Sequence, residues 1–96
     1  MTQLTLISPR DVALQPLIES AIANQLRILE VGMRQTLHRI KAFEEQFGLK
    51  TDDFVHKYAN DEIQETLDTI EWLGEYRMAQ RIQTKIDTLK EIQFAH

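Results

Sequence analysis

The sequence predicts an all-α fold: a long antiparallel helical hairpin with a short connecting helix, which dimerises into a helical bundle. Apolar residues recur every three or four positions from Leu17 to Phe47, which is the period of one helix face. A second amphipathic stretch runs from Asp61 to about position 93, and the 96 residues include only three glycines and two prolines. We therefore expect one helical domain, 1–96, with a thin core that self-association would extend.

Residues 1–16 are expected to form an amino-terminal arm with one short helical turn. Ser8, Pro9 and Asp11 stand in the order of an N-cap, a first helical residue and a capping-box acid. Pro16 lacks an N–H and disfavours helix at Gln15, so we expect a kink before the long helix 17–47. If Pro16 instead lies in the first turn of that helix, the result is nearly the same.

The connection between the two long helices is predicted to hold a short helix at 52–59. Gly48 can adopt the left-handed conformation that ends a helix, and Thr51 can cap the next one. Asp52 and Asp53 then lie in a first turn, where negative charge is favoured. The apolar side chains of this helix would cover the end of the hairpin: Phe54, Val55 and Tyr58.

The last helix, 61–93, shows two apolar faces rotated relative to each other. One face comprises Ile63, Leu67, Ile70 and Gly74, and the other comprises Met78, Ile82, Ile86 and Leu89. Either the helix bends at its glycine or its two halves meet different neighbours. The second option predicts that the first face packs inside the hairpin and that the second face is the oligomer interface of a homodimer.

An acidic and aromatic surface is the candidate partner-binding site. Trp72 and Tyr76 lie one turn apart, and Asp61, Glu65 and Asp68 share their side of the predicted helix. Tryptophan and tyrosine are enriched among residues that carry interface energy, so this surface suits a basic protein partner. The alternatives are that the rings cover an edge of the core or lie in the oligomer interface, and that the acids form a solvated face.

The charge distribution argues against general nucleic-acid binding. The net charge is −4, and the segment from residue 52 to 75 holds eight acidic side chains and only one basic side chain, Lys57. Arg27, Arg34 and Lys41 recur every seven residues on the first long helix and could form a basic stripe. The competing interpretation is a solvated face paired with nearby glutamates, and no helix-turn-helix pattern is visible.

No catalytic, cofactor or metal pattern is found in the sequence. There is no cysteine, and His38, His56 and His96 lack the spacing that places two ligands on one helix face. Asp61, Glu65 and Asp68 could gather a cation, but without a histidine they make a poor site. We therefore predict a protein that is not an enzyme, with no cofactor and no metal. No apolar run approaches the ~20 residues that span a bilayer, so a cytoplasmic location without membrane contact is expected.

Two segments carry a resemblance to a known group of proteins. The first is Phe43-Glu44-Glu45-Gln46-Phe47-Gly48-Leu49 followed by Thr51-Asp52-Asp53-Phe54, and the second is Glu71-Trp72-Leu73 before an amphipathic tail. Over residues 37–92 the chain resembles small uncharacterised all-helical proteins of archaea and cyanobacteria that look like the antitoxin components of prokaryotic toxin–antitoxin pairs. The resemblance implies a neighbour-encoded protein partner and no catalytic residue.

Two classes of function therefore remain open from the sequence. The first is a non-catalytic, antitoxin-like protein-interaction module that binds a basic partner. The second is a regulatory protein that binds nucleic acid through its basic stripe. A purely structural helical dimer is the residual alternative.

Overall fold

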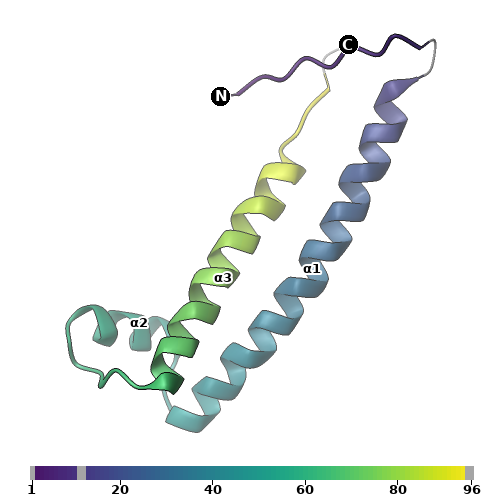
Figure 1. Cartoon of the computed structure of the whole chain (residues 1–96). Coiled ribbons are helices and arrows are strands. Elements are labelled where there is room, and N and C mark those ends of the chain that lie inside the picture. The colour runs from purple at the N-terminus through teal and green to yellow at the C-terminus, as the bar shows by residue number, and fades with distance from the viewer. Residues whose placement is uncertain (1, 11–12, 95–96) are drawn as a thin grey trace.

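The fold is a two-helix hairpin with a short helix packed against its closed end. The computed structural model describes residues 2–10 and 13–94, which form α1 (Leu14–Phe47), α2 (Thr51–Ala59) and α3 (Leu67–Lys90). The two long helices run antiparallel and side by side, and α2 lies beside the start of α3 (Figure 1). The molecule measures 60 × 25 × 18 Å. The predicted all-helical hairpin is confirmed.

The first long helix is continuous from Leu14, so the kink expected at Gln15 is absent. Pro16 lies in the first turn of α1, where its missing N–H removes no intrahelical bond. The helix ends at Gly48, as predicted, with a left-handed φ of 61° and its N–H bonded to the Glu44 carbonyl. Ser8 accepts a hydrogen bond from the Arg10 N–H, but Ser8 to Arg10 are not helical. Asp11, the predicted capping acid, lies outside the described residues.

The third helix begins at Leu67, later than the predicted Asp61. Asp61 adopts a φ of 60°, which is incompatible with the first turn of a right-handed helix. Thr66 is the N-cap: its side chain accepts from the Thr69 N–H, and the Thr69 hydroxyl accepts from the Thr66 N–H. This reciprocal pair satisfies two end-of-helix donors and fixes the start of α3.

The core is a stack of aromatic rings at the closed end of the hairpin. Trp72 and Phe54 are both 0% exposed, and their rings stack with centroids 3.8 Å apart and planes 2° apart. Phe43 and Phe47 of α1 stack on the same indole, with centroids at 5.9 and 5.4 Å. All three helices therefore meet around Trp72. Aromatic side chains bury large apolar areas, so this cluster contributes strongly to the stability of the fold.

The face of α3 that enters the core differs from the predicted one. Leu67 is 72% exposed and Ile70 and Gly74 are also exposed, whereas Thr69, Trp72 and Leu73 are buried. Burying Trp72 together with Leu73 removes more apolar surface than burying Leu67 and Ile70 would, so the helix is rotated to favour the ring. Of the predicted inner face, only Ile63 packs against the core, from the loop before α3.

The second predicted face of α3 is directed largely toward its own hairpin. Ile86 is buried, and the terminal methyl of Ile82 lies 3.8 Å from the position that a Cβ on Gly32 would occupy. Leu89 is half-buried, and Met78 remains exposed. Because Ile82 and Ile86 pack α3 on α1, these two members of the set are not free to contact a second chain.

Candidate functional site

A buried threonine, Thr51, links the three helices through hydrogen bonds. The Thr51 hydroxyl, on α2, donates to Glu44 Oε2 of α1 at 2.8 Å and accepts from the Trp72 Nε1 of α3 at 3.1 Å. The Thr51 backbone N–H donates to the same Glu44 oxygen at 2.8 Å. These two bonds, the backbone one first, hold the pKa of Glu44 below its ordinary value of 4.5. Thr51 thus anchors the helices and does not act as the predicted N-cap, a position that Lys50 occupies.

The buried position of Trp72 corrects the proposed aromatic docking surface. Its ring is sealed among phenylalanines and its only polar atom is already bonded to Thr51, so it cannot contact a partner. Tyr76 is half-buried against the same cluster, and its hydroxyl accepts a hydrogen bond from Gln80 at 2.9 Å. The alternative interpretation, in which the rings belong to the core, describes Trp72.

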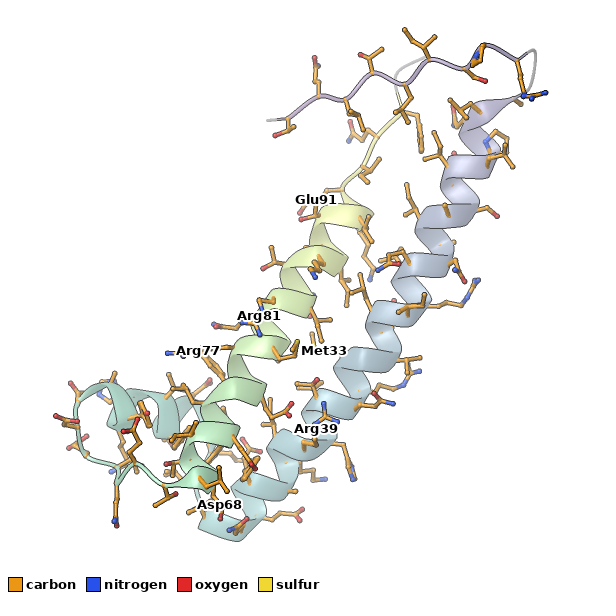
Figure 2. All side chains as sticks on the ribbon, in the orientation of Figure 1. Met33, Arg39, Asp68, Arg77, Arg81 and Glu91 are labelled. Carbon is orange, nitrogen blue, oxygen red and sulfur yellow. The ribbon has the colours of Figure 1, made fainter. Side chains whose placement is uncertain are left out.

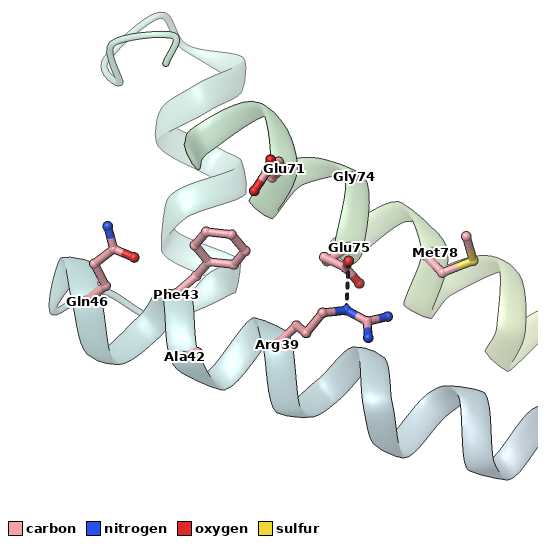
Figure 3. Close-up of a pocket in the computed structure, with 8 residues that line it drawn as sticks. All are labelled: Arg39, Ala42, Phe43, Gln46, Glu71, Gly74, Glu75 and Met78. Atoms are coloured by element: carbon pink, nitrogen blue, oxygen red, sulfur yellow. Dashed lines mark hydrogen bonds and ion pairs between the residues drawn. The ribbon is translucent and has the colours of Figure 1, made fainter. Parts of the chain in front are cut away.

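A groove lies between α1 and α3 in the part of the chain that the structure describes. Its volume is about 590 Å³. The Phe43 ring forms the floor of the groove, Gly74 has no side chain to cover it, and Met78 lies at one end (Figure 3). The remaining lining residues are polar or small: Arg39, Ala42, Gln46, Glu71 and Glu75. The groove therefore offers an apolar floor between charged walls.

The electrostatics of the groove leave one carboxylate oxygen unused. Arg39 Nε donates to Glu75 Oε1 at 2.9 Å, which pairs one charge of each wall (Figure 3). Glu75 Oε2 is buried and has no hydrogen-bond partner among the described residues. Glu71 lies one turn before Glu75 on the same wall, exposed and facing the groove. A buried acceptor without a donor is costly, so a donor entering the groove would be favoured.

The three predicted acidic residues separate into two locations. Asp68 Oδ2 accepts from Gln46 Nε2 at 3.0 Å, which places it at the end of the groove. Glu65 instead accepts the Tyr58 hydroxyl at 2.6 Å beside α2, and Asp61 is exposed in the loop that leads to it. The hydrogen bond to Glu65 raises the pKa of Tyr58 above 10.0. Only Asp68 of the predicted set adjoins the groove.

The groove acids were missed by the sequence analysis, although a signal existed. Glu71 and Glu75 are spaced by four residues and so lie on one side of α3, with Met78 next along that side. The sequence prediction placed Trp72 on the surface and therefore assigned the wrong face of α3 to the core. Glu71 and Glu75 were consequently not recognised as residues that face α1.

The three residues of the predicted basic stripe on α1 are solvent-exposed. Arg27, Arg34 and Lys41 are exposed, and the Arg27 guanidinium donates to the Asn24 side chain at 3.1 Å. On α3, Arg77 and Arg81 point away from α1, whereas Met33 and Arg39 of α1 point toward α3 (Figure 2). The basic residues of the hairpin therefore do not all share one face, since Arg39 is directed toward α3 and Arg77 and Arg81 away from α1.

Within residues 2–10 and 13–94, no three histidine, aspartate or glutamate side chains gather as metal ligands. In the same part of the chain, no helix has the length and apolar character needed to cross a membrane.

Comparison with protein families, curated proteins and solved structures gave no match to this chain. The assignment of function therefore depends on the geometry of the groove and the chemistry of its walls.

Proposed function

We propose that the chain is a non-catalytic protein-interaction module that binds a basic segment of a partner protein in the groove between α1 and α3. The observation that carries this proposal is the carboxylate wall: Glu71 is exposed, and Glu75 holds a buried oxygen without a donor. A lysine or arginine side chain that pairs with the exposed Glu71 brings a matching charge and hydrogen-bond donors into the groove beside Glu75. Phe43 and Met78 accept the methylene stem of such a side chain.

The position of the groove supports this role. It lies at the closed end of the hairpin, over the aromatic cluster and the Glu44–Thr51–Trp72 hydrogen bonds. A wall built on packed helices is preorganised, which lowers the entropy lost on binding. Eight acidic residues between positions 52 and 75 also attract a basic partner before contact.

The resemblance to antitoxin components makes a small neighbour-encoded protein the expected partner. Co-expression of the two proteins should yield a stable complex whose affinity falls as salt rises. Glu71→Lys should weaken this complex about 10-fold or more, since it reverses a charge in the groove wall. Glu62→Lys makes the same charge change on the exposed loop outside the groove and is the matched control.

Titration calorimetry with the purified pair measures both variants, and circular dichroism checks that helicity is unchanged. Equal affinity of the Glu71→Lys and Glu62→Lys variants would show that the groove is not the binding site.

A further inference from the structure

A second apolar stripe runs along α1, separate from the face that packs on α3. Leu17 is 60% exposed and Ile28 is 56% exposed, although both belong to a helix that already buries another face. With their neighbours they follow alternating steps of three and four residues, the spacing of a coiled-coil seam. The stripe comprises Leu14, Leu17, Ala21, Asn24, Ile28 and Val31.

The first part of the stripe lies where the hairpin offers least cover. The amino-terminal end of α1 extends beyond the last turn of α3 (Figure 1). From Ala13 to Leu26 the only charged residue is Glu19. No member of the stripe is charged, so the stripe itself offers no charge to attract an acidic or a basic partner and no repulsion to a copy of itself.

We infer that the stripe is the interface at which α1 pairs antiparallel with α1 of a second copy of this chain. In an antiparallel pair, each a position packs against a d position of the other helix. Assigning Leu14, Ala21 and Ile28 to a, and Leu17, Asn24 and Val31 to d, brings every member of the stripe against another member. The layers are Leu14 with Val31, Leu17 with Ile28 and Ala21 with Asn24, each occurring twice about the two-fold axis.

The side chains beside the stripe select this register. Arg27 of each copy then lies beside Ser20 of the other, whereas a shift of one heptad toward greater overlap would set Arg27 against Arg27. Like charges at such a position destabilise the pair. Asn24 is placed next to the small Ala21, and its Oδ1 keeps the hydrogen bond from Arg27 of its own helix. The paired segment of 18 residues is about 27 Å long.

This pairing is independent of partner binding at the groove, because the stripe ends at Val31 and the groove begins at Arg39. The two copies point their closed ends in opposite directions. Both grooves therefore remain open in the dimer.

The oligomeric state of the full chain tests the inference. Light scattering should give twice the 11.3 kDa chain mass at micromolar concentration. Ile28→Asp should raise the dimer dissociation constant about 100-fold, because it buries an unpaired charge in the seam. Leu37→Asp is the matched control, since Leu37 is 51% exposed on the same helix but lies off the stripe. Both variants should keep the helicity of the wild type, because each side chain is more than half exposed in the single chain.

Cysteine cross-linking tests the antiparallel register, because the natural chain has no cysteine. A mixture of Leu17→Cys and Ile28→Cys chains, one of them tagged, should oxidise mainly to the mixed disulfide. A monomeric wild type, equal dissociation of the Ile28→Asp and Leu37→Asp variants, or disulfides only between identical positions would each overturn the inference. Failure of the groove variant Glu71→Lys to lose its partner would leave these results unchanged, so the two proposals fail separately.

Discussion

The Thr51 hydroxyl should contribute more to stability than its small size suggests. Replacing Thr51 by valine keeps the shape of the side chain but removes its hydrogen bonds to Glu44 and Trp72. The bond to the carboxylate contributes about 1.5–3 kcal/mol, and a buried indole N–H left without an acceptor costs about 1–3 kcal/mol. The extra methyl of valine offsets part of this, so we expect a loss of about 2–4 kcal/mol in the free energy of unfolding.

Urea unfolding followed by circular dichroism, at a fixed protein concentration, measures this loss. Thr51→Ser is the control: it keeps the hydroxyl and loses one methyl group, which should cost only about 0.8 kcal/mol. If the valine variant were as stable as the serine variant or more stable, the hydroxyl would not tie the three helices together, and the reasoning would be refuted.

Three further predictions concern titration and backbone conformation. Because the folded-state pKa of Glu44 is lowered, its contribution to stability is fully present above pH 4.5 and is lost as the pH falls through the folded-state value; Glu44→Gln should flatten the acid limb of stability against pH. The pKa of Tyr58 is raised, so its contribution is present below pH 10.0 and is lost as the pH rises through the folded-state value; Glu65→Ala should lower that pKa in an ultraviolet titration, and an unchanged curve would contradict the Tyr58–Glu65 bond. Gly48→Ala should destabilise the fold by about 1–2 kcal/mol, because Gly48 has a φ of 61°. Gly74→Ala should stabilise the fold by about 1 kcal/mol, because Gly74 lies within helix α3 with open space for a Cβ. Thermal melts measure both changes.

The long helices could be predicted from the sequence because their evidence is local. A regular apolar period defines α1, and Gly48 marks its end through a conformation that other residues adopt at a cost. The start of α3 was harder, because Thr66 and Thr69 form the capping box with a threonine where the common pattern has glutamate or glutamine. Asn60 and Asp61 therefore looked like the better start.

The rotation of α3 could not be predicted from its own residues. Leu67, Ile70 and Gly74 form a regular face, and nothing within α3 shows that Trp72 meets Phe43, Phe47 and Phe54 from two other helices. The choice between the two faces is made by tertiary packing, which overrides a local period. The same rotation decides which acidic residues of α3 face α1. The sequence therefore predicted a different candidate site from the one in the structure.

The concentration of the core at one end has a consequence for motion. Stability in such a rod should decrease with distance from the aromatic stack, so backbone amides near Trp72 should exchange with solvent slowly and those near Leu17 quickly. A ligand that binds near Trp72, where exchange is slow, meets a surface that is already ordered. A contact made near Leu17 would instead reduce local fluctuations. Its formation should slow amide exchange progressively along α1 toward the amino terminus.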